Sequence, residues 1–142
     1  MIVKVGNYVN PTNFIIYGGI IMEQVKVSEI EEIITVVTNY TEGCSKGNTA
    51  QMRKAFDKGA VMYGYLNGQL YDGSIDNLYG AVDSLGSDEN MKTHIDVLNV
   101  EGTAASVRVT LENWHGLSFT DYHSLLKING EWKIVAKVFH QY

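Results

Sequence analysis

The 142-residue sequence predicts an α+β domain in which helices pack on one face of an antiparallel sheet. Three observations support this fold class. Apolar residues recur at helical spacing in the first part of the chain, whereas apolar and polar residues alternate after residue 91. The alternating segments are joined by short turns that contain glycine, and such short connections make consecutive strands antiparallel.

Hydrophobic residues make up 45% of the chain and charged residues 19%, which is typical of one folded globular domain. The single cysteine, Cys44, excludes a disulfide framework. The longest apolar segment, residues 14–22, contains two glycines and is shorter than the roughly 20 residues that cross a membrane. The formal net charge is −5 and no run of Lys or Arg occurs, so we expect neither a nucleic-acid nor a membrane partner.

The first 21 residues differ from the rest because they show neither helical periodicity nor a helix-capping signal. We predict an atypical N-terminal extension over residues 1–21 and a single domain over residues 22–142, with Met22 as an alternative translation start. The extension has one basic residue, Lys4, and lacks the cleavage pattern of a secretory leader. Together with the lone cysteine, this predicts a cytoplasmic protein.

The first helix is predicted from a capping box, in which Ser28 and Glu31 each satisfy a free backbone N–H group. Gly43 is placed to end this helix, and Cys44 then falls in a flexible loop. One apolar stripe faces the expected core. It contains Ile30, Ile33, Ile34, Val37 and Tyr40.

Two shorter helices and a hairpin follow. The second helix is expected over residues 49–58 with Asn48 as its cap, and the third begins after Ser74 and ends at Gly86. Between them, the Asn67-Gly68 turn predicts a hairpin. Its strands cover residues 60–65 and 69–71, and the four long strands that come later cover residues 92–100, 104–114, 119–128 and 132–140.

The last two strands can be aligned through the turn at Asn129 and Gly130. A two-residue loop places Leu125 opposite Ile134 and His123 opposite Ala136. Alternation then puts one set of side chains on the face that the helices cover, and we expect Trp132 and Phe139 to be packing residues. This face carries Phe119, Asp121, His123, Leu125, Trp132, Ile134, Ala136, Val138 and His140, and the other carries Thr120, Tyr122, Ser124, Leu126, Lys133, Val135, Lys137 and Phe139.

Three motifs occur together and in order near the C-terminus: Phe-x-Asp-Tyr from residue 119, Leu-Leu-Lys-Ile-x-Gly-Glu-Trp-Lys-Ile from residue 125, and Lys-Val-Phe-His from residue 137. They resemble the C-terminal signature of the putative lumazine-binding family. That family belongs to the nuclear transport factor 2-like superfamily, with polyketide cyclases and ketosteroid isomerase as relatives. From about Val27 onward, the resemblance implies a cone-like fold with a strongly curved sheet around helices, a pocket at its open end, and homodimers formed through the sheet.

Asp121 and His123 are the predicted catalytic residues. The two residues are two positions apart on a predicted strand, so their side chains share one face and their Cα atoms are about 7 Å apart. A histidine whose pKa is adjusted by a carboxylate is suited to transfer protons near neutral pH. The alternative is a polar pair with a packing role beneath a helix, or a polar pair at the rim.

The remaining predicted site residues are ligand contacts. Tyr40 ends the apolar stripe of the first helix, where its hydroxyl could stabilise developing charge. His94 and Asp96 share one face of their strand, but the turn at residues 101–102 leaves open which face that is. We also assign ligand contact to Tyr63, Val138 and His140.

No residue spacing in the sequence is typical of a metal site, and no pattern demands a cofactor. We therefore predict a mostly apolar pocket for a small apolar or aromatic molecule. Three functions remain open: a proton-transfer enzyme of the isomerase, dehydratase or cyclase type, a non-catalytic ligand-binding module, and a dimeric interaction domain. An ionisable group buried at the pocket wall would favour the enzyme.

Overall fold

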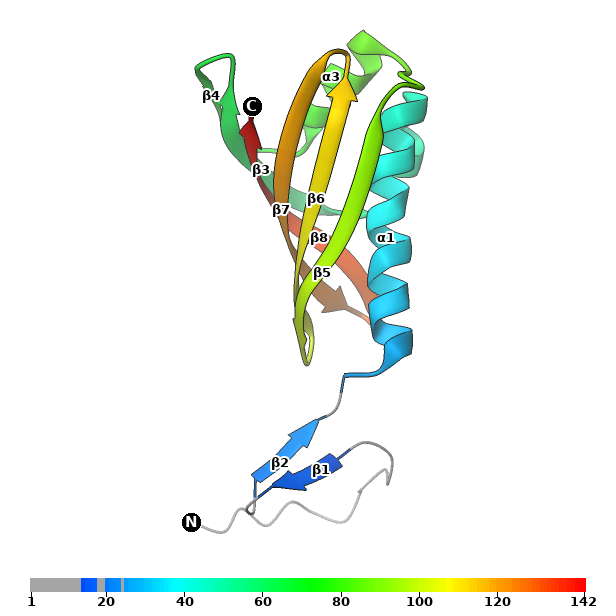
Figure 1. Ribbon diagram of the computed structural model, residues 1–142, viewed down its shortest axis with the longest axis vertical. Coiled ribbons are helices and arrows are strands. Elements are labelled where there is room, and N and C mark those ends of the chain that lie inside the picture. Colours follow the sequence, from blue (N-terminus) through cyan, green and yellow to red (C-terminus); the bar gives the residue numbers. More distant parts are fainter. Residues whose placement is uncertain (1–13, 18–19, 24) are drawn as a thin grey trace.

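The computed structural model describes residues 14–17, 20–23 and 25–142. Within residues 25–142, a long helix lies along a curved six-stranded sheet, with the shorter helices at one end (Figure 1). This arrangement confirms the predicted α+β fold class. The elements are α1 (Val27–Lys46), α2 (Thr49–Met52), β3 (Phe56–Leu66), β4 (Gln69–Tyr71), α3 (Asp76–Leu85), β5 (Lys92–Glu101), β6 (Ala104–Trp114), β7 (Leu117–Ile128) and β8 (Glu131–Gln141).

The strands of the sheet follow the order β4-β3-β8-β7-β6-β5. From β5 to β8 each strand is antiparallel to the next, as the short turns predict. The pairing of β3 with β8 is parallel, so the sheet is mixed rather than purely antiparallel. The rule for short turns does not apply to this pair, because α3 and four strands separate β3 from β8 in the chain.

The start of α1 differs from the predicted capping box. Lys26 is the N-cap residue and makes no capping bond through its side chain. Glu29, in the first turn, instead accepts hydrogen bonds from Lys127 Nζ at 2.7 Å and from Trp132 Nε1 at 2.8 Å. A carboxylate near the start of α1 therefore bonds the helix to the ends of β7 and β8 that flank their turn.

Helix α1 also continues past the predicted stop at Gly43 to Lys46. Its C-cap is Gly47, whose φ of 65° lies in the left-handed region that favours glycine. Gly43 serves a different purpose. A Cβ atom there would lie 2.6 Å from Met52 Cγ and 2.8 Å from the backbone oxygen of Asn48. The missing side chain allows α2 to approach α1 closely.

Helix α2 is shorter than the predicted segment of residues 49–58. Asn48 does cap it, since its side chain accepts a hydrogen bond from the backbone N–H of Gln51 at 3.0 Å. The chain then enters β3 at Phe56, which is buried and pairs with Ile134 of β8. Strand pairing and burial override the helical spacing of these residues.

The bulge in β8 changes the predicted faces of that strand. Leu125 pairs with Ile134 as expected, but the next pair joins Ser124 to Ala136, which leaves Val135 as an extra residue. Beyond this bulge the alternation reverses, and His123 pairs with Lys137 rather than with Ala136. The prediction for the second half of β8 was therefore wrong: Lys137 and Phe139 are buried, and Val138 and His140 are exposed.

The core lies between α1 and the covered face of the sheet. Ile33, Val37 and Tyr40 of the predicted stripe are buried, whereas Ile34 remains 39% exposed. Trp132 is buried against this helix, which confirms its packing role. Since both layers contribute apolar side chains, their burial fixes the helix on the sheet.

Strands β1 (Phe14–Tyr17) and β2 (Ile20–Glu23) form a separate antiparallel pair. Residues 1–13, 18–19 and 24 lie outside the described residues, so the predicted extension over residues 1–21 is only partly covered. The boundary before residue 22 falls within β2 and stays a prediction. In the part of the chain that the structure describes, no helix has the length and apolar character to cross a membrane.

Candidate functional site

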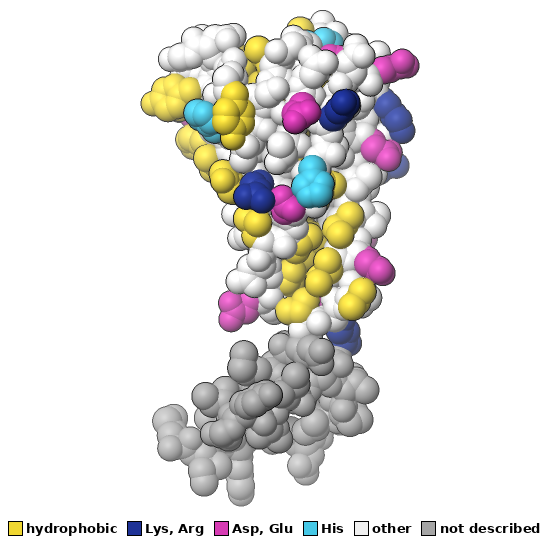
Figure 2. Space-filling model, in the orientation of Figure 1, with side chains coloured by type: hydrophobic (Ala, Val, Ile, Leu, Met, Phe, Trp, Pro, Cys, Tyr) yellow, Lys and Arg dark blue, Asp and Glu magenta, His cyan; other side chains and the backbone are white. Residues whose placement is uncertain are grey.

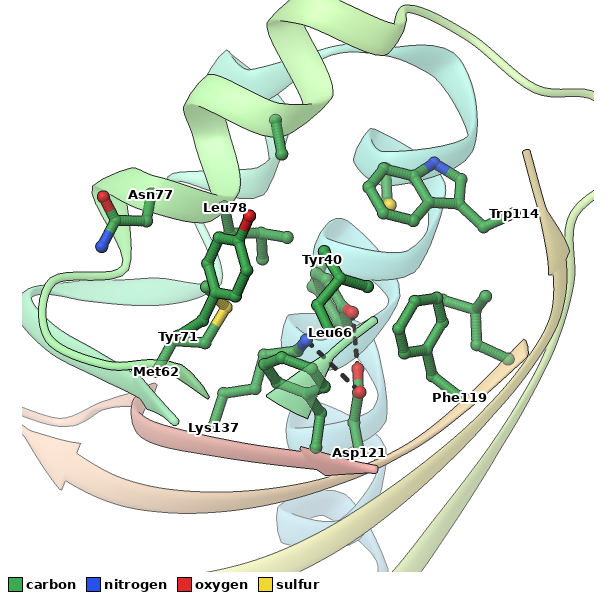
Figure 3. Close-up of a pocket in the computed structure, with 14 residues that line it drawn as sticks. Tyr40, Met62, Leu66, Tyr71, Asn77, Leu78, Trp114, Phe119, Asp121 and Lys137 are labelled. Atoms are coloured by element: carbon green, nitrogen blue, oxygen red, sulfur yellow. Dashed lines mark hydrogen bonds and ion pairs between the residues drawn. The ribbon is translucent and has the colours of Figure 1, made fainter. Parts of the chain in front are cut away.

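A cavity of about 60 Å³ lies between α1, α3 and the covered face of the sheet (Figure 3). Its wall is largely apolar. Tyr71 of β4 and Asn77 of α3 belong to the lining and are themselves exposed, so they mark the side that opens to solvent. The apolar lining includes Met62, Leu78, Leu111, Trp114, Phe119 and Phe139.

Three polar side chains meet at one wall of this cavity, and each comes from a different element. Tyr40 Oη of α1 donates a hydrogen bond of 2.6 Å to Asp121 Oδ2 of β7. Lys137 Nζ of β8 lies 3.3 Å from Asp121 Oδ1 (Figure 3). The exposed fractions of Tyr40, Asp121 and Lys137 are 1%, 0% and 5%. The cavity wall thus contains a buried ion pair, held in apolar surroundings.

Strand register places these groups together. Asp121 pairs with Phe139 across β7 and β8, and His123 pairs with Lys137. The lysine therefore stands diagonally next to the aspartate on the same face, within reach of a long side chain. Without the bulge at Val135, Lys137 would lie on the outer face.

The protonation states follow from burial and from the charges nearby. Burial alone would raise the pKa of Asp121, but the Lys137 ammonium, together with His123 and Tyr40, outweighs it and lowers this pKa to about 2. Burial and the charge of Asp121 hold the pKa of Tyr40 well above its ordinary value. At neutral pH, Asp121 is a carboxylate and Tyr40 is a neutral hydrogen-bond donor.

His123 lies behind the carboxylate and does not line the cavity. Its Nε2 atom is 3.6 Å from Asp121 Oδ2, which is longer than a hydrogen bond, and its ring packs against Tyr40 and Phe56. Among the described residues, neither ring nitrogen has a hydrogen-bond partner. Burial lowers the pKa of His123, and the charge of Lys137 adds to this effect while Asp121 opposes it. A neutral imidazole is the result at neutral pH.

Of the six predicted ligand contacts, Tyr40 lines the cavity and the other five lie on the outer face of the sheet. The bulge turns Val138 and His140 outward. Asp96 accepts a hydrogen bond from Arg108 at 2.9 Å and lies 3.0 Å from His94 Nε2, so these polar groups satisfy one another. Tyr63 stands beside Val138 in the parallel pair and is 45% exposed.

Lys137 is the site residue that the sequence prediction missed. One signal marks it: a single lysine lies within the apolar run from Ile134 to Phe139. Cys44 was also misplaced, because it lies in α1 and lines the cavity rather than a loop. Burial raises the pKa of this thiol to about 12, so it is protonated at neutral pH and is a poor nucleophile.

The described residues contain no group of three or more His, Cys, Asp or Glu side chains that could hold a metal ion. The titratable side chains at the cavity wall are the carboxylate of Asp121, the phenols of Tyr40 and Tyr71, the thiol of Cys44 and the ammonium of Lys137, and the imidazole of His123 lies behind the carboxylate.

Comparison with known proteins identifies the family and the fold of the chain. The sequence profile of the family described as putative lumazine-binding matches residues 28–140. Aldolase FrzH from Cladobotryum sp. is 34% identical over 116 residues, which cover 81% of this chain and 93% of that protein. An NTF2-like protein of unknown function from Methylobacillus flagellatus has a TM-score of 0.81 and 37% identity, covering 84% of this chain and 96% of that one. A second NTF2-like protein of unknown function, from Shewanella baltica, has a TM-score of 0.79 and 32% identity, covering 84% and 98% of the two chains.

Proposed function

Because the chain belongs to the putative lumazine-binding family and has the NTF2-like fold, we propose that its cavity binds a small, mostly apolar carbonyl compound and catalyses proton transfer at the carbon next to the carbonyl group. The observation that carries this proposal is the buried carboxylate of Asp121 at the wall of an apolar cavity. Burial favours the protonated form of this carboxylate, so Asp121 is suited to accept a proton once a bound molecule draws the Lys137 ammonium away from it.

Each polar group has a role in this proposal. Asp121 is the base that takes the proton, and the hydrogen bond from Tyr40 fixes the orientation of the carboxylate. His123 lies 3.6 Å from the same carboxylate, on the side away from the cavity, and is proposed to share the proton with it. In this proposal Asp121 and His123 share the acid–base role, and Asp121 is the member that contacts the ligand.

The relative from Cladobotryum gives independent support for the reaction class. Its name describes an aldolase, and it matches this chain over most of its own length. In an aldol reaction, removal of a proton next to a carbonyl group produces the enolate that attacks a second carbonyl carbon. A base in an apolar cavity is what this first step requires.

The test does not require the natural substrate. We would incubate the protein in D₂O with small ketones, aldehydes and aryl ketones, and follow deuterium uptake at the carbon next to each carbonyl by NMR. The wild-type protein should accelerate uptake for at least one compound, and D121N should lose that acceleration. The matched control is D96N, which changes a carboxylate on the outer face. Equal rates for D121N and the wild type would refute the proposed base.

A second function, a dimeric interaction module, is favoured by the outer face of the sheet. Tyr63, Val138 and Tyr122 stand side by side on β3, β8 and β7, and their exposed fractions are 45%, 53% and 51%. Figure 2 shows hydrophobic side chains over the strands, with charged and histidine side chains between them. We propose that this row lies in a homodimer interface. Sedimentation equilibrium of the wild type and V138E tests it, since a charge in the interface should shift the protein toward monomer.

A further inference from the structure

Lys137 places an ammonium group at the wall of a largely apolar cavity, next to the carboxylate of Asp121. Its side chain is almost fully buried, and Nζ lies 4.7 Å from the centre of the Phe139 ring and 5.8 Å from that of Tyr40. Among the described residues that line the cavity, it is the one basic side chain. Its partner is the carboxylate of Asp121, at 3.3 Å.

The two charges cancel, and this balance restricts which ligands can enter. A neutral molecule leaves the cavity wall with no net charge. A carboxylate ligand would add an uncompensated negative charge, and an ammonium ligand an uncompensated positive one. An unpaired charge in apolar surroundings is strongly unfavourable, so both classes should bind weakly.

We infer that the Asp121–Lys137 pair selects neutral, weakly acidic molecules, namely enolisable carbonyl compounds and phenols, and holds the anion formed from them against the ammonium of Lys137. This inference rests on the proposed function and names its substrate class. The proton of the ligand's C–H or O–H bond passes to Asp121. The electron pair of that bond stays on the ligand, where it is delocalised onto the oxygen atom.

Charge is conserved through this step. Before it, Lys137 is positive and Asp121 negative; after it, Lys137 is positive, Asp121 is neutral and the ligand oxygen is negative. As the ammonium turns from the carboxylate toward the new oxyanion, Asp121 loses the partner that makes it a weak base. Proton uptake by Asp121 and anion stabilisation by Lys137 therefore favour each other.

The experiment uses three probes of similar shape that absorb in the ultraviolet: para-nitrophenol, para-nitrobenzoate and para-nitroanisole. The pH is set so that the free phenol is mostly protonated. Binding to the wild-type protein should produce the phenolate absorbance band, and para-nitrobenzoate should bind at least about tenfold more weakly than the phenol. The anisole, which has no acidic proton, should bind without a change of band.

Variants assign the effect to the pair. K137M should bind the phenol without the phenolate band, and the double variant D121N/K137M, which removes both charges together, should do the same. K133M is the matched control, because Lys133 lies on the same strand and donates its hydrogen bond to the backbone oxygen of Lys54 outside the cavity. Circular dichroism establishes that each variant is folded.

Three results would overturn the inference: no binding of para-nitrophenol to the wild type, binding in the protonated form, or equally tight binding of para-nitrobenzoate. Deuterium uptake by carbonyl compounds without phenol ionisation would leave the proton-transfer proposal intact and refute the role of the ion pair. Phenol ionisation without deuterium uptake would support the role of the ion pair in selecting ligands. It would count against the proposal that the protein removes a proton from the carbon next to a carbonyl group.

Discussion

Lys137 Nζ lies 3.3 Å from Asp121 Oδ1, although alternation along β8 places the two residues on opposite faces of the sheet. One extra residue, Val135, accounts for this difference, because the bulge reverses the direction of every side chain that follows it in the strand. The charged centre of the cavity wall therefore depends on a local irregularity of the backbone.

Removing one charge of this pair should destabilise the protein more than removing both. D121N leaves the Lys137 ammonium buried without its carboxylate, and breaking a buried pair in this way costs about 3–5 kcal/mol. D121N/K137M leaves neither charge and should lie closer to the wild type. Urea denaturation measures the free energies of unfolding, and a double variant less stable than D121N would contradict the prediction.

Replacing Tyr40 by phenylalanine should cost about 1.5–3 kcal/mol, because the lost hydrogen bond is made to an ionised, fully buried carboxylate. The expected measurement is a lower urea midpoint with an unchanged slope. Y63F is the matched control. Because Tyr63 is partly exposed on the outer face, the free energy of unfolding of this variant should hardly differ from that of the wild type. Equal effects at the two positions would show that the hydrogen bond contributes little.

His123 should make stability depend on pH. Its pKa is lowered in the folded protein, so as the pH falls the unfolded chain takes up a proton first, near pH 6.5. The stability that the neutral imidazole contributes is thus present above this pH and is lost as the pH falls further. Denaturation midpoints from about pH 8 to about pH 5 should decline less in H123Q than in the wild type. H140Q, which changes an exposed imidazole, should retain the wild-type decline.

Two glycine-to-alanine substitutions should have opposite signs. In G43A the new methyl group would lie 2.6 Å from Met52 Cγ and 2.8 Å from a backbone oxygen, so overpacking should cost about 1–3 kcal/mol. In G80A the new methyl group meets no atom within 4 Å apart from its chain neighbours and the backbone of its own helix, and the higher helix propensity of alanine should stabilise α3 by about 0.5–1 kcal/mol. Thermal melting of both variants measures the two shifts.

The sequence was informative wherever one local rule determined the structure. Period-two alternation located the four long strands, and the Asn-Gly pairs located two tight turns, where Asn67 and Asn129 both have a φ of 51°. Gly86 ends α3 as predicted. The family resemblance then supplied the curvature of the sheet, which no local pattern determines.

The misses have one physical cause, since each depended on contacts between residues distant in the chain. Phe56 begins a strand because Ile134 pairs with it, and Gly43 lies inside α1, where its missing side chain leaves room for Met52 of α2. The bulge in β8 likewise depends on how β7 pairs with β8, and no residue pattern in the sequence predicts it. It is why Val138 and His140 were predicted in the pocket and Lys137 was not.

The extra residue in β8 also affects how related proteins are compared. A relative with one residue fewer before the lysine would present its equivalents of Val138 and His140 to the chamber. Alignments that ignore the inserted position would then equate interior side chains of one protein with surface side chains of another. Differences in substrate preference among these relatives would then be assigned to the wrong alignment positions, even though their helices, turns and strand order are the same.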